Sequence, residues 1–318
     1  MNQIYFLFKN QLITALFCSL IAVTTAIITT PEFQIPEFSV LNKSCKVVII
    51  IPAYNEEQRI AKTLHAYLDY FTHLEKVSAT FLVVCNNCTD KTVEICKNIQ
   101  KKHAELHIMD LPQKGKGFAI KQGFLKALDF HIADYIGFVD ADMATTPPYF
   151  YELITKIKDY DGAIASRYTT GARVWPNRPF IKRIGGQFYN WVLRRNFHLD
   201  IRDTQCGAKL FTYQTIQMVA PHMQETGWAW DLEFLYICQL FDKNIIEVPT
   251  TWTDVPGSHL SISRCYKEFL SSPARIKQNQ KQLAQKLKHQ KDLEKHALRQ
   301  KNRAKKRLQQ DPVFLASK

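Results

Sequence analysis

The chain has 318 residues, of which 46% are apolar and 22% charged, so it is globular in composition and long enough for one large core or two modest ones. Its net charge is +13, but residues 275–307 hold thirteen Lys and Arg against two acids and so carry +11 of it. The remainder is nearly neutral, which argues against a nucleic-acid-binding core, because such a core carries a basic patch on its folded face.

The first 30 residues contain a long uncharged stretch. No charged residue lies between Lys9 and Glu32, and about 20 predominantly apolar residues suffice to cross a bilayer. We predict a membrane anchor over residues 1–30, with a cleaved signal peptide as the alternative. Basic residues on the two flanks nearly balance, so the positive-inside rule leaves the orientation open. Residues 31–45 are predicted to be a linker.

An alternation of strands and helices begins at residue 46. The apolar run 47–51 predicts a strand that is buried on both faces, as in parallel sheets. Further strands are expected at 80–84, 106–109, 135–139 and 161–166. Helices are expected from Glu56, over 90–100 and 117–129, and after a Thr146 cap. Repeated β-α units with short connections predict an α/β fold with a doubly wound, mostly parallel sheet, in which ligands bind at the carboxyl ends of the strands.

Two carboxylates follow the predicted strand 135–139. Asp140 and Asp142 are one residue apart, and residues i and i+2 of an extended segment point to the same side. Hard cations prefer carboxylate oxygen, and Mg²⁺ is usually shared with the phosphates of a substrate. The pair therefore predicts a Mg²⁺ or Mn²⁺ site for a phosphorylated donor, against the alternative of a solvated strand end.

Other polar clusters also stand at predicted strand ends. The segment 52–56 follows the first strand, 86–89 the second, and a glycine-rich turn, Gly115-Lys116-Gly117, precedes a helix. Lysines in such a turn can supply a cation and backbone N–H donors to an anion. An ordinary exposed turn is the alternative for this last segment.

The segments 50–56, 86–92, 114–117 and 140–142 together resemble family 2 glycosyltransferases of the GT-A fold in order and spacing. Residues 202–211, 228–233 and 247–258 are similar to the dolichyl-phosphate β-glucosyltransferase branch of polyprenyl-phosphate sugar transferases. The resemblance covers residues 46–262, which we expect to form the glycosyltransferase domain. A basic extension, 263–318, follows it and is atypical of the branch; we expect it to be helical or partly disordered.

The resemblance implies a UDP-sugar donor, with a divalent ion on Asp140 and Asp142 opposing the charge that grows on the leaving diphosphate. Lys114 and Lys116 would contact the donor. Four residues would line the nucleoside pocket: Pro52, Tyr54, Asn55 and Glu56. Many family members have two aspartates where this chain has Cys85 and Asn86, yet the Asn86 carbonyl can still accept a hydrogen bond from uracil.

The implied acceptor is a polyprenyl phosphate. A phosphomonoester has a second pKa of about 6, so it is mostly ionised at neutral pH and needs cations to hold it rather than a base. Arg167 and Lys209 match positions that resemble acceptor-phosphate contacts, as does Arg202. Asp231 and Glu233 stand where relatives that use a hydroxyl acceptor keep their base. For a phosphate acceptor, Asp231 would instead orient an Arg or Lys side chain. We expect both Asp142 and Asp231 to act in catalysis.

These residues predict an inverting transfer of a sugar, most simply glucose from UDP-glucose, to a polyprenyl or dolichyl phosphate. One rival is a family 2 transferase that glycosylates a saccharide or protein hydroxyl with Asp231 as base. Another is an inactive, membrane-tethered nucleotide-sugar-binding protein, against which the intact aspartate pair speaks. Nucleotide sugars are cytosolic, so we expect a membrane-anchored enzyme whose catalytic domain faces the cytosol, at the endoplasmic reticulum in a eukaryote or the inner membrane in a bacterium. No protein partner is predicted.

Overall fold

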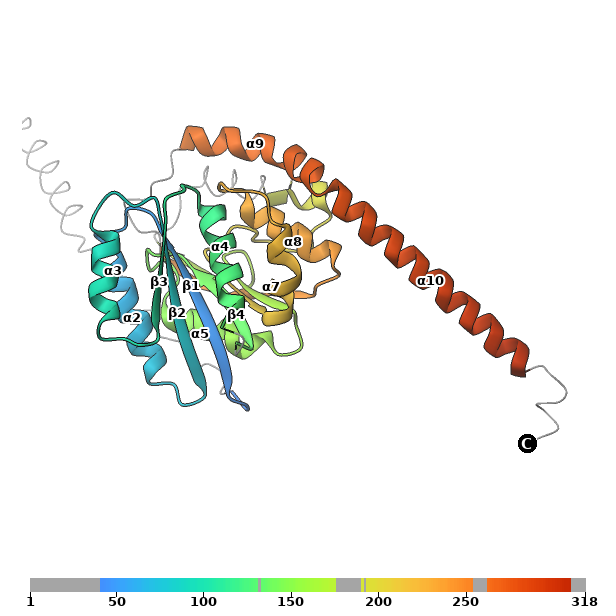
Figure 1. The fold of residues 1–318 in the computed structure, drawn as a ribbon, viewed down its shortest axis with the longest axis horizontal. Helices are drawn as coiled ribbons and strands as arrows, with labels where there is room; N and C mark the ends of the chain where they lie inside the picture. The colour runs from blue at the N-terminus through green and yellow to red at the C-terminus, as the bar shows by residue number, and fades with distance from the viewer. Residues whose placement is uncertain (1–40, 131–132, 176–189, 192, 254–261, 310–318) are drawn as a thin grey trace, which may run out of the picture. The chain divides into compact units, whose positions relative to one another are not determined.

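The computed structural model describes residues 41–130, 133–175, 190–191, 193–253 and 262–309 (Figure 1). The predicted anchor at 1–30 and most of the predicted linker lie outside this part of the chain. None of the helices in the described ranges combines the length and the apolar character that a membrane crossing requires.

The strands are β1 (Cys45–Ala53), β2 (Val77–Asn86), β3 (Leu106–Leu111), β4 (Tyr135–Val139), β5 (Gly162–Ser166), β6 (Arg173–Trp175), β7 (Ala208–Thr212), β8 (Ile245–Pro249) and β9 (Thr251–Thr253). The helices are α2 (Ile60–Thr72), α3 (Thr92–Gln100), α4 (Lys116–Leu128), α5 (Pro147–Ile157), α7 (Tyr213–Val219), α8 (Trp230–Leu240), α9 (Ile262–Asn279) and α10 (Lys281–Gln309), with a 3₁₀ turn η1 (Ala220–His222).

The central sheet has the strand order β3-β2-β1-β4-β7-β5-β8. All neighbouring pairs in it are parallel except those of β7, which runs antiparallel to both β4 and β5. The expectation of a mostly parallel α/β sheet is confirmed. A separate short pair, β6 with β9, is also parallel.

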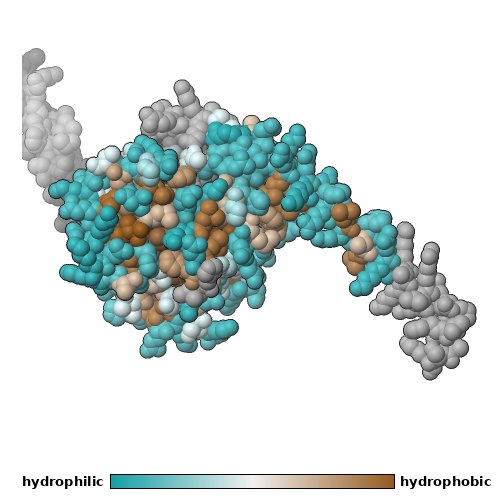
Figure 2. Space-filling view, in the orientation of Figure 1, coloured by the Kyte–Doolittle hydropathy of each residue, from teal (hydrophilic) through white to brown (hydrophobic). Residues whose placement is uncertain are grey.

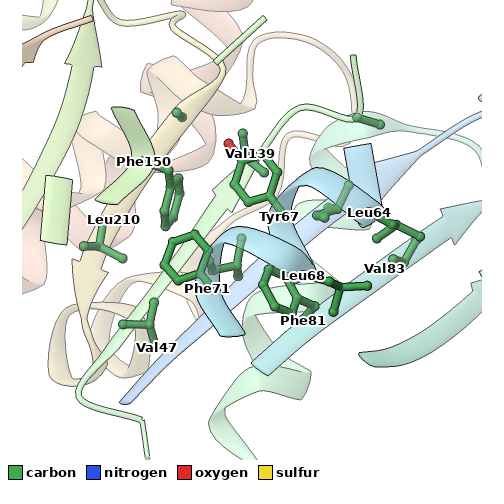
Figure 3. Packing of buried hydrophobic residues seen from close by; sticks show 14 of the residues in the cluster. Val47, Leu64, Tyr67, Leu68, Phe71, Phe81, Val83, Val139, Phe150 and Leu210 are labelled. Atoms are coloured by element: carbon green, nitrogen blue, oxygen red, sulfur yellow. The ribbon is translucent and has the colours of Figure 1, made fainter. Parts of the chain in front are cut away.

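Helices cover both faces of the sheet, which explains why its strands are apolar on both sides. Alternate residues of β1 point into two different cores. Ile49 lies in the first core, on the face covered by α2, α3 and α5, whereas Ile50 lies in the second core, on the face covered by α4, α7 and α8. On the first face, the rings of Tyr67 and Phe71 from α2 meet Phe150 from α5 (Figure 3). This packing fixes α2 and α5 beside the carboxyl end of β4.

Two local predictions differ in detail from the structure. The first helix begins at Ile60 rather than Glu56, because the Glu56 carbonyl accepts the Arg59 and Ile60 amides in a turn that precedes the helix. Thr146 does precede α5, but its side chain makes no capping hydrogen bond. The α5 helix has proline in its first turn, where a missing N–H costs nothing.

The basic extension forms α9 and α10. From α9, Ile276 is fully buried in the second core, while α10 is predominantly hydrophilic on the face that Figure 2 shows. Leu293 and Leu298 of α10 are 57% and 59% exposed. The extension therefore packs against the rest of the described fold through α9, while much of α10 is exposed to solvent.

Candidate active site

The polar segments after β1, β2, β3 and β4 meet at one edge of the sheet, as parallel strands require. The amine of Lys114 donates to the Tyr54 hydroxyl at 2.8 Å and lies 4.4 Å from the centre of its ring. The Asn55 side chain accepts the Thr89 amide at 2.8 Å. Asn55 itself has φ 53°, in the left-handed region that asparagine tolerates better than most residues.

The turn that carries the two aspartates is held from below by α2. The hydroxyl of Thr63 donates to the Ala141 carbonyl at 2.7 Å, and the hydroxyl of Tyr67 donates to the Thr145 carbonyl at 2.8 Å. Both hydroxyls belong to buried side chains, so these bonds are shielded from water. The helix that packs the core thus also fixes the position of the aspartates.

Asp140 and Asp142 lie in a strongly charged setting. The amine of Lys116 donates to Asp140 Oδ1 at 2.5 Å, and Asp142 accepts the Ala144 amide at 3.0 Å. Burial, and then the neighbouring Asp140, raise the pKa of the Asp142 carboxyl. Burial alone would lower the pKa of the Lys116 amine, but Asp140 and Asp231 outweigh it and raise that pKa. A cation bound at the two carboxylates would therefore favour the charged form of Asp142.

The residues present fit a divalent ion. Two carboxylates one residue apart supply hard oxygen ligands, and Asp140 disfavours the charged form of Asp142. Within the described ranges, no three His, Cys, Asp or Glu side chains gather in a way that suits a metal, at this edge of the sheet or elsewhere, so the protein would supply two carboxylates. Asp140 and Asp142 would hold such an ion together with donor phosphates and water.

Gly207 makes room for Asp140. A Cβ atom at this glycine would lie 2.2 Å from Asp140 Oδ2, while the Gly207 carbonyl accepts the Asp140 amide at 2.9 Å. We expect Gly207→Ala to push the carboxylate aside and to lower the transfer rate roughly tenfold to a hundredfold. Steady-state rates beside thermal unfolding will check this; an unchanged rate in a folded variant would contradict it.

The predicted nucleoside-pocket residues divide into two groups. Tyr54, Asn55 and Glu56 are partly exposed. Pro52 is buried within β1, and Asn86 is buried with its amide donating to the Ala53 carbonyl at 2.9 Å. The Asn86 carbonyl also faces the Gly115 amide at 3.3 Å. Asn86 therefore joins three strand ends, and its carbonyl keeps a second lone pair for a ligand.

Lys209 and Asp231 form a buried ion pair. The amine of Lys209 contacts the Asp231 carboxylate and donates to the Cys206 carbonyl at 2.8 Å, in a fully buried position. Burial raises the pKa of Asp231 in spite of the opposing charges of Lys209 and Lys116. Lys209 thus acts in this structure through the charge of an internal pair rather than as a surface cation.

Arg167 is held by Asp203. Its Nε and Nη2 groups donate to the two carboxylate oxygens at 2.8 and 2.9 Å, and its backbone amide donates to Oδ2 at 2.9 Å. Glu247 in turn accepts the amides of Arg202 and Asp203 at 2.8 and 2.9 Å. Burial would raise the pKa of Asp203, but Arg167 outweighs it and lowers that pKa. Two of the five guanidinium N–H donors are engaged with Asp203, and the rest can face an anion.

Asp203→Asn should lower the free energy of unfolding by about 3 kcal/mol at neutral pH, because it leaves the Arg167 charge without its partner in a mostly buried position. Since the pKa of Asp203 is lowered on folding, its stabilisation is complete above the ordinary value of about 4 and is lost as the pH falls through the folded value. Urea unfolding of both proteins from pH ~7 down to ~3 will test this. A difference that does not shrink in acid would contradict it.

Sequence reasoning missed three features of the site: Asp203 as the partner of Arg167, Gly207 beneath Asp140, and the loop of residues 224–228, hereafter the 224–228 loop. Asp203 and Gly207 lie in the quoted segment 202–211, so that motif already contained the signal. Of the 224–228 loop, only Trp228 lies in a quoted segment, and no local pattern shows the contacts to Gly117 and Phe118, which cross more than a hundred residues.

Comparisons with known proteins agree with these features. The sequence model named "Glycosyl transferase family 2" matches residues 48–218. The dolichyl-phosphate beta-glucosyltransferase of Drosophila melanogaster is 32% identical over 235 residues, which cover 69% of this chain and 70% of that protein. The protein of that name from Homo sapiens is 29% identical over 232 residues, covering 67% and 68%.

Among solved structures, the chain is similar to glucosyl-3-phosphoglycerate synthase from Mycobacterium tuberculosis in complex with Mn²⁺, uridine-diphosphate and glucosyl-3-phosphoglycerate. The TM-score is 0.52 at 13% sequence identity, over 74% of this chain and 80% of that chain. At this identity the likeness concerns the fold alone.

Proposed function

The chain belongs to glycosyltransferase family 2, and from this we propose that it transfers glucose from UDP-glucose to the phosphate of a dolichyl-type polyprenyl phosphate. Its sheet is that of a GT-A-like α/β fold. The observation that carries the proposal is the match of more than two thirds of the chain to dolichyl-phosphate beta-glucosyltransferases. The clustered charges at the sheet edge suit this chemistry.

The donor binds where the loops after β1, β2 and β4 meet. Tyr54, Asn55 and Glu56 face the nucleoside, and Lys114 and Lys116 bring positive charge toward the diphosphate. A Mg²⁺ or Mn²⁺ ion held by Asp140 and Asp142 supplies Lewis-acid stabilisation of the leaving UDP when it is bound. Lys116, whose raised pKa keeps it charged, adds a fixed cation at the same place.

The acceptor phosphate needs no base to become a nucleophile, since its second ionisation is near pH 6. One of its oxygens attacks the anomeric carbon of glucose from the side opposite UDP, which inverts the configuration and releases UDP. Arg167, held in place by Asp203, offers its remaining N–H groups to the phosphate. Lys209 adds positive charge from its buried position, and Asp231 orients the Lys209 amine.

One observation favours a second function, transfer to a saccharide or protein hydroxyl. Burial raises the pKa of Asp231, as is common for a general base. Against this, the Asp231 carboxylate is already paired with Lys209, and a paired carboxylate is a weaker base.

Membrane attachment is part of the proposal because the acceptor is a lipid. The uncharged stretch before residue 31 would anchor the chain with its catalytic domain in the cytosol, where UDP-glucose is made. In a eukaryote the membrane would be that of the endoplasmic reticulum.

Labelled glucose transfer tests the proposal. The full chain in detergent receives labelled UDP-glucose, Mg²⁺ or Mn²⁺, and either a short polyprenyl phosphate or the matching polyprenol. We expect label in the lipid phase with the phosphate only, and none once the metal is chelated. Transfer to the polyprenol instead would point to the hydroxyl reaction, and label in neither lipid would overturn the proposed acceptor class.

A further inference from the structure

We infer that Arg275 of α9 is a positioning residue that holds the 224–228 loop against Lys116 and Asp140, so that the C-terminal extension forms part of the catalytic machinery. This inference rests on the transferase function proposed above. In Figure 1, α9 runs along the same end of the sheet as the amino terminus of α4.

Arg275 binds the acidic residue of the 224–228 loop, Glu225. Its Nε and Nη2 groups donate to the two carboxylate oxygens of Glu225, both at 2.7 Å. The Glu225 side chain is only 4% exposed. The Arg275 side chain is 43% exposed, but the buried carboxylate requires a partner, so the loss of this bidentate pair should cost more than the loss of an ion pair between two exposed side chains.

The extension also holds the loop through α8. Glu233 accepts the amides of Gln224 and Glu225 at 2.8 and 2.7 Å through one carboxylate oxygen. The side chain of Gln280, between α9 and α10, donates to the other oxygen at 2.8 Å. Gln280 is itself buried. The loop is therefore fixed at its start by two groups of the extension and one of α8.

The 224–228 loop contacts the glycine-rich turn of the active site, residues 115–117. The Gly117 and Phe118 amides, which lie in the first turn of α4, donate to the Gly227 and Thr226 carbonyls at 3.2 Å each. A Cβ at Gly117 would lie 2.4 Å from the Glu225 carbonyl oxygen, so the two backbones are in direct contact.

Lys116 lies between these contacts. Its amine is 5.2 Å from the centre of the Trp228 ring on one side and bonds Asp140 on the other. A shift of the loop must therefore move the Lys116 amine relative to Asp140. Misplacement of a reacting or stabilising group by ~1 Å can cost on the order of a hundredfold in rate.

A second ion pair of the extension serves as the matched control. Lys291 of α10 pairs with Asp242 at 2.5 Å and donates to the Leu240 carbonyl at 3.2 Å, at the opposite end of α8 from the active site. This pair is largely exposed, and its loss should have little effect.

The test compares Arg275→Ala, Arg275→Lys and Lys291→Ala in the full chain, below their unfolding temperatures. We expect Arg275→Ala to lower kcat for glucose transfer about tenfold or more with a smaller change in KM for the lipid. Arg275→Lys should recover part of the loss, and Lys291→Ala should keep the wild-type rate. Hydrogen exchange at peptides covering 114–118 and 224–230 should quicken in Arg275→Ala alone.

A wild-type kcat and wild-type exchange in Arg275→Ala would overturn the inference, as would an equal loss in Lys291→Ala. If Arg275→Ala does not fold, the isosteric Glu225→Gln gives the same comparison. The exchange experiment needs no substrate, so it tests whether Arg275 holds the 224–228 loop even if the wild-type protein transfers no glucose. A wild-type protein without transfer activity would count against the proposed function only.

Discussion

Asp142→Asn should lower the rate of glucose transfer by about a thousandfold, roughly 4 kcal/mol of transition-state stabilisation. Asparagine has nearly the same shape, so the hydrogen bond with Ala144 and the turn held by α2 should persist. What is lost is one of the two carboxylates that would hold the divalent ion against the leaving diphosphate. Because the turn is kept, the loss should fall on kcat more than on folding.

The measurement is steady-state transfer beside calorimetric binding of UDP with and without Mn²⁺. We expect the metal-dependent part of UDP binding to disappear in Asp142→Asn. Asp69→Asn is the matched control, since it makes the same chemical change on the exposed side of α2. A rate above about a tenth of wild type in Asp142→Asn would mean that this residue does not hold a required ion.

The sequence predicted the part of the site that depends on strand ends. Asp140 and Asn55 follow strongly apolar segments, and Lys116 stands in a glycine-rich turn. Parallel strands bring the residues that follow their carboxyl ends to one edge of the sheet, whatever the details of the loops. Their hydrogen-bonded contacts, such as Lys116 with Asp140, follow from that convergence.

Features set by long-range packing could not be read in the same way. The strand β7 lies antiparallel between β4 and β5, although it follows β5 by about forty residues, and no local periodicity specifies that insertion. The burial of Lys209 depends on this insertion, because its neighbours Phe138 and Trp230 come from β4 and α8. Lysine is rarely buried without a partner, so composition alone favours the surface.

The same long-range packing explains the C-terminal extension. Its charge marks it as a basic tail in the sequence, yet Ile276 and Gln280 are buried against the body. A single apolar residue and one amide in a run of lysines do not stand out in any window of the sequence. Only the fold shows that they meet α8 and the 224–228 loop.

The Lys209 and Asp231 pair separates the two acceptor chemistries. If the acceptor is a phosphate, Asp231→Asn should keep the transfer rate within about tenfold of wild type, because no base is needed. Lys209→Met should lose far more, since it removes a cation and strands a buried carboxylate, at about 3 to 5 kcal/mol of stability. The double variant Lys209→Met with Asp231→Asn removes that stranded charge, so it should fold better than Lys209→Met while remaining about a hundredfold slower than wild type.

The pH dependence of kcat gives the second readout. For a phosphate acceptor, activity should fall below about pH 6 as the phosphate is protonated, and the same limb should persist in Asp231→Asn. For a hydroxyl acceptor, the acid limb would belong to the raised pKa of Asp231 and would vanish with that carboxylate, along with most of the activity. An inactive Asp231→Asn beside an active Lys209→Met would therefore assign Asp231 as the base. An active Asp231→Asn beside an inactive Lys209→Met would indicate that the pair contributes the positive charge of Lys209 to the binding of an anionic acceptor.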